Sequence, residues 1–449
     1  MDLESVGDLA IHMILENLKP EDIASISCVS NRFRSVTSDD SLWSKICFHE
    51  LSLTQPIDHR GNPLPSFKEA YRTWREDFVM YPWSLVKRVK RCWDNIETWL
   101  VNNFPEAKET LCEGASEAEI QELEDVLNVK LPLPTRILYR LHNGQEIEKL
   151  DVDTSTDAFG TSLGIIGGYS FYDHLVNVYL LPISHIIEET QQITNNLGFL
   201  RRSKYVLVAA SSTYSEKLFF LNCTNGQLYV GTKELITNRD MMPCVPRNLI
   251  SLDRELDGEK IQDAMLLWLE EHGRRLQRGF IKLIEEGKAK SINLFPEEPP
   301  LCSTAVTNGV QVRASALVIP ELTDLQEGRE KYLFSYSIRL SLQPQGCMIN
   351  GISHRSCQLY WRHWLIHAND VVVSDVDGEA VIGMMSLQYP LLRPGDKEFA
   401  YQSCAALPTS SGSVEGSFTF VPGRLVEPKG DPFIATVARF PLERPDYIF

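Results

Sequence analysis

The stretch Ser41-Leu42-Trp43-Ser44-Lys45-Ile46 ends a run of short helical signals at the start of this 449-residue chain. Earlier in the run, apolar residues recur at the i, i+3, i+4, i+7 spacing of one helical face. These residues are Ile11, Ile14, Leu15 and Leu18. Pro20 should end that first helix, because proline breaks a helix interior but fits the first turn of the next helix.

A second short helix is predicted by the apolar residues that follow, which are Ile23, Ile26, Val29 and Phe33. Two amphipathic pieces this short cannot cover all of their apolar surface by themselves, because small units lack interior volume. The first 50 residues therefore predict a helical unit with an apolar surface that another protein covers. The alternative is a plain helical subdomain that has no partner.

This N-terminal run resembles an F-box. The resemblance implies that the unit docks on a Skp-type adaptor, which links it to a cullin–RING ubiquitin ligase. It assigns adaptor contact to Leu9, Ile14, Leu15, Leu18, Ile23, Ile26, Val29, Leu42 and Trp43.

Length and composition indicate an ordinary globular protein of about three domains, at roughly 150 residues per domain. The hydrophobic fraction is 43% and the charged fraction 23%, and no apolar stretch is long enough for a membrane span. Acidic Asp2 and Glu4 do not fit the basic start of a signal peptide. The ten cysteines are scattered without a Cys-x-x-Cys pair, which favours reduced thiols. We therefore expect a cytoplasmic or nuclear protein that does not bind a membrane.

The net charge of −16 argues against nucleic-acid binding, which depends on neutralising phosphates. One basic stretch, residues 87–91, lies among tryptophans. It could bind RNA or a membrane surface, or it could be the solvated face of a helix. We favour the helix face, with these residues packed inward: Trp83, Val86, Val89 and Trp93.

Helical spacing of aromatic residues continues from residue 51 to residue 115, and it predicts a connector of packed helices. The aromatic residues are Phe67, Tyr71, Trp74, Phe78 and Tyr81. A rigid connector of this kind would hold the rest of the chain at a fixed angle to the N-terminal unit.

A second domain is expected over residues 116–290. Ser116 and Glu119 form a capping-box signature, in which each side chain bonds to a free backbone donor of the other residue. The order of Leu123-Glu124, Leu131-Pro132 and Asn143-Gly144 resembles the opening of the SUKH superfamily, which implies an α+β fold. Strands are expected at 205–209 and 218–221, with Asn225-Gly226 as a hairpin turn, and a helix at 262–277.

Residues 291–300 predict a stiff linker because they end in Pro296-Glu297-Glu298-Pro299-Pro300. The domain after it, residues 301–449, is predicted to be all-β. Apolar residues from Phe334 to Leu342 alternate with polar ones, which is typical of a strand with one buried face. Several such strands, separated by Gly and Pro turns, indicate a sandwich of two antiparallel sheets.

The same domain resembles the ApaG family. The motifs, in order, are Val310-Gln311-Val312, Arg362-His363-Trp364, Gly378-Glu379-Ala380-Val381-Ile382-Gly383, Arg393-Pro394-Gly395, Leu407-Pro408-Thr409 and Gly412-Ser413-Val414-Glu415-Gly416. The resemblance implies a fibronectin-III-like or immunoglobulin-like sandwich.

Signs of bound groups or catalysis are weak. The Gly378-to-Gly383 motif approximates a dinucleotide-binding loop, but it lies among strands and is better explained as a tight turn. The densest group of candidate metal ligands is Cys347, His354, Cys357, His363 and His367. Its irregular spacing favours ordinary packing over a zinc site. Hydrolase, metalloprotease and phosphate-loop motifs are missing, so we expect no metal, no cofactor and no catalytic site.

The three resemblances in this order match a class of plant F-box proteins, the Skp-interacting partners, with relatives in animals. They imply the substrate-recognition subunit of an SCF-type (Skp–cullin–F-box) ubiquitin ligase, which captures a protein substrate and is not itself an enzyme. Two alternatives stay open: a scaffold that does not lead to degradation, and an ApaG-like domain that binds a small anion or a metal.

Overall fold

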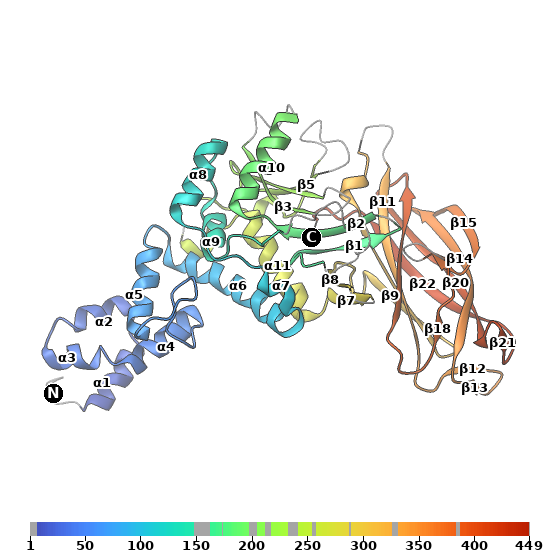
Figure 1. The fold of residues 1–449 in the computed structure, drawn as a ribbon, viewed down its shortest axis with the longest axis horizontal. Helices are drawn as coiled ribbons and strands as arrows, with labels where there is room; N and C mark the ends of the chain where they lie inside the picture. The colour runs from blue at the N-terminus through green and yellow to red at the C-terminus, as the bar shows by residue number, and fades with distance from the viewer. Residues whose placement is uncertain are drawn as a thin grey trace.

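The protein has three parts in a row, a helical arm, a middle region built on one sheet, and a β-sandwich (Figure 1). The computed structural model describes residues 7–147, 162–172, 174–196, 204–211, 217–231, 241–253, 257–286, 289–325, 331–382 and 387–448. None of the helices in these ranges is both long and apolar enough to cross a bilayer. The expected fold class, a helical N-terminus, an α+β middle and an all-β sandwich, is confirmed.

Four short helices form the outer end of the arm. They are α1 (Asp8–Leu15), α2 (Pro20–Ile26), α3 (Asn31–Val36) and α4 (Asp40–Leu51). Pro20 lies in the first turn of α2, as predicted. The prediction of one helix through Phe33 is wrong, because Ser30 starts a new helix by accepting a hydrogen bond from the Phe33 amide at 3.3 Å.

The connector consists of packed helices, as predicted. They are α5 (Phe67–Asp77), α6 (Trp83–Asn103) and α7 (Pro105–Glu109). The carboxylate of Glu50, near the end of α4, accepts hydrogen bonds from Tyr71 Oη at 2.9 Å and Trp83 Nε1 at 2.8 Å. Lys87 Nζ lies 3.3 Å from the same carboxylate. One side chain thus ties α4, α5 and α6 together.

The basic stretch lies on α6, so the prediction of a helix that packs its apolar residues inward is confirmed. Its cations are not a solvated face, however, because Lys87 and Arg88 are partly buried, Lys90 is buried and Arg91 is the one that is exposed. Arg88 forms two hydrogen bonds to the Glu270 carboxylate, at 2.8 and 2.7 Å, and Lys90 pairs with Asp94 at 2.7 Å. The apolar residues expected to point inward are Val86, Val89 and Trp93, which are buried, and Trp83, which is partly buried. Arg88 also joins the arm to the middle region, because Glu270 lies on α11 (Ala264–Arg278) of that region.

Helices pack on the eight-stranded sheet of the middle region (Figure 1). The helices are α8 (Glu117–Leu127), α9 (Leu133–Leu141), α10 (Ile183–Asn196) and α11 (Ala264–Arg278), with short 3-10 turns η4 (Arg247–Leu249) and η5 (Gly258–Lys260). The strands are β1 (Gly167–Phe171), β2 (His174–Leu180), β3 (Tyr205–Ser211), β4 (Leu218–Asn222), β5 (Leu228–Gly231), β6 (Met241–Pro243), β7 (Lys282–Glu286) and β8 (Ala289–Asn293). Their order is β6-β5-β4-β3-β2-β1-β8-β7.

Local signals in this region are confirmed. Ser116 and Glu119 form the capping box at the start of α8. The turn at Asn225-Gly226 joins β4 to β5, and Gly226 has the positive φ of +71° that glycine allows. Asp263 caps α11 by accepting a hydrogen bond from the Leu266 amide at 2.9 Å, as a buried side chain.

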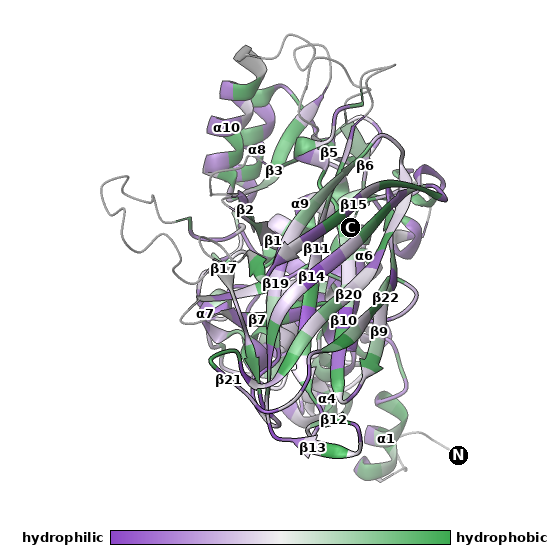
Figure 2. Ribbon diagram, turned by 90° about the vertical axis from the view of Figure 1, so that its right-hand side faces the viewer, coloured by the Kyte–Doolittle hydropathy of each residue, from purple (hydrophilic) through white to green (hydrophobic). Residues whose placement is uncertain are grey.

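Two sheets form the C-terminal sandwich, which Figure 2 views from its outer side. The inner sheet has the order β19-β11-β10-β9, and the outer sheet runs β15-β14-β20, with β22 also paired to β20. The strands are β9 (Cys302–Thr307), β10 (Val310–Val318), β11 (Tyr332–Leu342), β12 (Cys347–Ile349), β13 (Ile352–His354), β14 (Cys357–Ala368), β15 (Val371–Glu379), β16 (Val381–Ile382), β17 (Leu387–Gln388), β18 (Leu391–Leu392), β19 (Phe399–Leu407), β20 (Ser411–Arg424), β21 (Glu427–Pro428) and β22 (Phe433–Glu443). A 3-10 turn, η6 (Pro320–Leu322), lies between β10 and β11.

Strand β11 is buried on both faces, so the prediction of one buried face is wrong. Tyr336 packs inside the sandwich against Trp364 and Phe440. On the other face, Ser335 and Ser337 are fully buried. The reason is tertiary: β1 of the middle region packs against β11 and β19 and covers the polar face.

The segment expected as a linker is packed between the two regions. Ser291 lies in β8, and Phe295 is buried. The carboxylate of Glu297 pairs with Arg313 and, at 3.2 Å, with Arg339, both in the sandwich. The proline-rich composition predicted stiffness, but it could not predict that this segment serves as part of the contact between two regions.

The chain returns to the middle region at its C-terminus (Figure 1). After β22 ends at Glu443, the Ile448 amide donates a hydrogen bond to the Pro243 carbonyl in β6 at 2.9 Å, and Ile448 is buried. The tail therefore holds the sandwich against the edge of the middle sheet.

Candidate protein-binding surfaces

The N-terminal helices expose large apolar side chains. Leu9 is 79% exposed, Met13 62% and Ile14 49%, all on α1, and Val29 between α2 and α3 is 69% exposed. Full burial of such side chains is worth about 1.5–3 kcal/mol each. A partner that covers them would therefore gain a substantial free energy of binding.

The nine residues assigned to adaptor contact divide into three groups in the structure. Leu9, Ile14 and Val29 are exposed, while Leu18 and Ile26 are partly buried against the core. The remaining four are buried inside the arm: Leu15, Ile23, Leu42 and Trp43. The exposed three are accessible to a partner, whereas the buried four are not accessible in this structure.

Trp43 illustrates this supporting role. Its indole Nε1 donates a hydrogen bond to the Thr37 carbonyl at 2.7 Å, and its ring lies 5.4 Å from that of Tyr71 on α5. It therefore joins the end of α3 to α4 and the connector. Because indole rings are large and apolar, this residue stabilises the arm itself.

Sequence reasoning missed two exposed apolar residues, Met13 and Phe48, the latter 56% exposed on α4. Met13 follows Leu9 by one helical turn, so the i, i+4 spacing could have identified it. Our chosen helical face ran through Ile11 and Leu15, which the structure buries. The apolar spacing is compatible with two adjacent faces of α1. The structure shows which of them packs against the rest of the arm.

Ion pairs fix α1 to its neighbours around these apolar side chains. Asp8 pairs with Arg32 on α3 at 2.6 Å, and Glu16 pairs with Lys45 on α4 at 2.5 Å. The hydrogen bond from Lys45 lowers the pKa of the Glu16 carboxyl. The exposed face of α1 is thus held in place by polar contacts at both of its ends.

The contact between the middle region and the sandwich differs from the exposed apolar face of the arm, because it buries charged side chains. Glu321 of η6 accepts a hydrogen bond from Tyr169 Oη on β1 and lies 3.3 Å from His174 Nε2 on β2. Lys217 Nζ donates to Tyr169 Oη at 3.1 Å and lies 4.0 Å from Glu321 Oε2. Burial alone would raise the pKa of Glu321, but Lys217, His174 and Tyr169 together hold it below its usual value.

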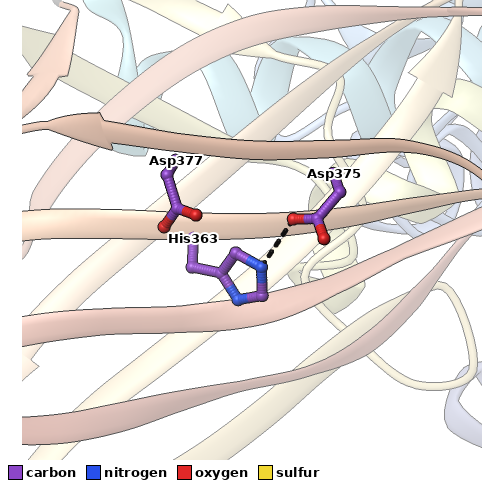
Figure 3. A group of neighbouring side chains, drawn as sticks. All are labelled: His363, Asp375 and Asp377. Atoms are coloured by element: carbon purple, nitrogen blue, oxygen red, sulfur yellow. Dashed lines mark hydrogen bonds and ion pairs between the residues drawn. The ribbon is translucent and has the colours of Figure 1, made fainter.

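The five candidate metal ligands on the sandwich do not form one group, although Cys347 pairs with His354 across β12 and β13. Cys347 and Cys357 are buried next to each other, and their mutual hydrogen bond lowers the pKa of Cys347. His367 lies 3.6 Å from Glu415, apart from the two thiols. His363 instead faces Asp375 and Asp377 on β15 (Figure 3).

That group, His363 with Asp375 and Asp377, has ligand atoms within 4.8 Å of one another and is the one such group among the described residues. Each of the three side chains already has a hydrogen-bond partner within the protein. His363 Nε2 bonds to Asp375 at 2.8 Å, and Trp361 Nε1 donates to Asp377 at 3.0 Å. All three residues lie on the outer sheet, and the carboxylates are exposed.

The glycine motif of the sandwich forms a turn after β15, as far as the structure describes it. Ala380 has φ +56°, and Arg362 Nη1 donates to the carbonyls of Glu379 and Ala380 at 2.8 and 2.6 Å. Gly383 lies outside the described residues. The motif does not lead into a helix N-terminus, which a dinucleotide site would require.

Three family models match the chain in order. They are F-box-like at residues 10–49, the SMI1/KNR4 family (SUKH-1) at 114–239, and the ApaG domain at 323–422. The ApaG protein of Anaeromyxobacter dehalogenans is 36% identical over 32% of this chain and 96% of its own length.

Two relatives extend over nearly the whole chain. F-box only protein 3 of Homo sapiens is 24% identical over 94% of this chain and 79% of its own length. F-box protein SKIP16 of Arabidopsis thaliana is 53% identical over 100% of both chains. The chain belongs to the family of F-box proteins that carry a SUKH-type and an ApaG domain.

Proposed function

We propose that the chain is the substrate-recognition subunit of an SCF-type ubiquitin ligase, docked through its N-terminal helices on a Skp-type adaptor and through that on a cullin and RING subunit. The observation that supports this most strongly is the exposure of Leu9, Met13, Ile14 and Val29 together on the outer helices of the arm. Side chains of this kind in contiguous patches mark protein-binding surfaces.

The arrangement of the three parts suits a presenting role. Glu50 ties the outer helices of the arm to α5 and α6, and Arg88 joins the arm to the middle region. Glu321 and Glu297 join the middle region to the sandwich. A substrate bound on the middle region or the sandwich would therefore stay at a defined distance from the ligase. Such tethering raises the effective concentration of the substrate at the loaded conjugating enzyme.

In this role the chain is not catalytic, because the recruited RING machinery transfers ubiquitin. We place it in the cytoplasm or nucleus, since its ten cysteines are free thiols, as a reducing compartment maintains. As a working division we keep an F-box at 1–50, a connector at 51–115 and an ApaG-like domain at 301–449. The boundary expected at residue 290 moves to 293, so that the SUKH-like domain includes all of β8 and a packed segment at 294–300 follows it.

The experiment that tests the proposal is reconstitution. The full chain is co-expressed with a Skp-type adaptor, a cullin and a RING subunit, and purified through a tag on the cullin. We expect the chain to be retained in the complex, and its depletion from cells to lengthen the half-lives of a defined set of proteins.

Two outcomes would change the conclusion. Absence of the chain from the purified complex would contradict adaptor docking. Retention without any change in protein half-lives would favour the scaffold alternative.

A further inference from the structure

Strand β15 is an open edge of the outer sheet. Among the described residues it pairs with β14 and with no other strand. It is nine residues long, and Val371, Val372 and Val373 are 68%, 50% and 47% exposed. Natural proteins usually protect edges of this kind with prolines, lysines or covering segments, because unpaired backbone groups invite another strand.

Another sheet edge of this protein is covered. Strand β6 receives the C-terminal tail, whose Ile448 amide bonds to Pro243. Among the described residues no such tail covers strand β15, and the strand contains no proline or lysine. The protection it does carry is its acidic side chains and the register shift opposite Ile366 and His367, which leave its outer backbone groups unpaired in the described part of the chain. The edge is therefore available to an extended segment of another protein.

The charge of this edge indicates which segment would fit. From residue 370 to residue 379 the chain carries four carboxylates and no lysine or arginine: Asp370, Asp375, Asp377 and Glu379. Asp370 is 99% exposed and Asp375 64%. The cations nearby are already engaged, since Arg439 lies 3.7 Å from Asp370 and Arg362 donates to backbone carbonyls.

Aromatic side chains flank the acidic half of the strand. Trp361 Nε1 bonds to Asp377, and Tyr389 Oη donates to Glu379 at 3.0 Å. Tyr360 is 40% exposed, and its ring lies 5.9 Å from that of Trp361. Carboxylates beside aromatic faces suit lysine and arginine side chains, which gain both ion pairing and cation–π attraction.

We propose that the β15 edge binds an extended, lysine- and arginine-rich segment of a protein substrate as an added strand. The valine half accepts apolar side chains, and the half from Asp375 to Glu379 accepts the basic ones. Main-chain hydrogen bonds to the open edge supply affinity, and the alternate side chains supply specificity. The inference rests on the proposed function, because it names the substrate class for the same receptor.

Charge also argues against two other occupants. In full antiparallel register, a second copy of β15 would place Asp375 opposite Asp375 and the other carboxylates of each strand opposite the valines of its partner. Like charges would meet once and no carboxylate would gain a cation, so self-pairing has no charge complementarity. An RNA backbone would be repelled by the same carboxylates. A basic peptide is the partner that complements this edge.

The test uses the full chain and a fluorescent, end-capped peptide of nine residues, with fluorescence anisotropy as the readout. The peptide has alternate lysines in its N-terminal half and valines in its C-terminal half, so that antiparallel pairing sets the lysines beside Asp375 to Glu379. We expect saturable binding that weakens with salt. The double variant Asp375→Lys/Asp377→Lys should raise the Kd at least tenfold. Its matched control, Glu427→Lys/Asp431→Lys, changes two exposed carboxylates elsewhere on the sandwich and should leave the Kd unchanged.

Peptide N-methylation separates strand addition from simple charge attraction. In an added strand, every second amide donates a hydrogen bond to the edge, and the amides between them point away. Methylating the first set should therefore abolish binding, and methylating the second set should leave binding unchanged. The milder variant Asp375→Asn/Asp377→Asn keeps the shape of both side chains and should weaken binding by a smaller factor.

Three results would overturn the inference: no binding of the lysine–valine peptide, equal binding by the charge-reversed and control variants, or equal effects of the two methylation sets. Adaptor retention is measured on the same proteins. If peptide binding fails while the adaptor is retained, the inference is wrong and the proposed function stands. Loss of the adaptor from the unmodified chain would contradict the proposed function itself.

Discussion

The outer helices of the arm and the contact between the middle region and the sandwich have opposite chemistry. The arm leaves Leu9, Met13 and Ile14 in solvent, whereas the contact between the middle region and the sandwich buries Lys217 and Glu321. Exposed apolar surface is unfavourable until a partner covers it, and a buried ion pair is stable only while both charges stay paired. The arm is thus incomplete by itself, whereas the contact between the middle region and the sandwich is closed by residues of the chain itself.

The largest expected effect is a difference in stability between a variant at a buried position of the arm and a variant at an exposed one. Trp43→Ala should lower the free energy of unfolding by about 3–5 kcal/mol, because it removes a buried indole. Leu9→Ala should change it by less than about 0.5 kcal/mol, as surface substitutions usually do. Hydrogen exchange over residues 8–51 measures both. Similar protection of residues 8–51 in the two variants would contradict the division of the arm into buried core residues and an exposed docking surface.

The contact between the middle region and the sandwich can be weakened by removing one buried charge. Glu321→Ala should cost about 3 kcal/mol, because Lys217 stays buried without its carboxylate partner. The double variant Lys217→Met/Glu321→Leu should recover most of that loss, since it leaves no unpaired charge. Thermal unfolding of both variants is the measurement. A single variant as stable as the unmodified chain would mean that these charges do not hold the two regions together.

Acid should weaken the middle region through His272. Burial lowers the pKa of this imidazole from 6.5 to about 4, and its Nε2 bonds to the Ile165 carbonyl at 2.8 Å. The unfolded chain binds a proton below about pH 6.5, whereas the folded chain does so only near pH 4. This contribution is therefore complete above pH 6.5 and declines as the pH falls, by on the order of 3 kcal/mol at pH 4.

Denaturant titrations at pH 7, 5.5 and 4 measure this decline. His272→Gln should flatten the pH dependence in that window while the far-UV spectrum at pH 7 stays the same. An unchanged slope in the variant would assign the acid sensitivity to other groups.

The smallest effect on stability is expected where α4 meets α5 and α6. Glu50→Gln weakens the carboxylate that holds Tyr71, Trp83 and Lys87, and it should cost about 1–2 kcal/mol. Hydrogen exchange in α5 should rise, and small-angle scattering should report a broader range of arm positions. Unchanged scattering with increased exchange would show that α6 alone keeps the arm in place.

Local signals predicted local structure well. The capping box at Ser116, the turn at Asn225-Gly226 and the helix containing Trp93 follow from interactions among neighbouring residues, which the sequence contains. Alternation around Phe334 predicted a strand for the same reason. The three domain resemblances depended on motifs of this local kind.

Features set by contacts between distant residues were not predictable. Burial of Ser335 and Ser337 depends on β1, which lies over 160 residues earlier in the chain. The choice between the two faces of α1 depends on where α3 and α4 pack. The group of His363, Asp375 and Asp377 required the register of β14 against β15, which pairs His363 with Asp377. Spacing along one strand does not contain that information.

Adaptor binding by the exposed face of the arm is the most direct test of the account. Isothermal titration of a Skp-type adaptor into the full chain should give a Kd that Leu9→Asp/Ile14→Asp raises more than 100-fold, about 3 kcal/mol, with the unfolding transition unchanged. Leu249→Asp, at a side chain of the middle region that is 45% exposed, is the matched control and should bind as the unmodified chain does. Equal affinity in all three proteins would contradict the claim that this surface docks the adaptor.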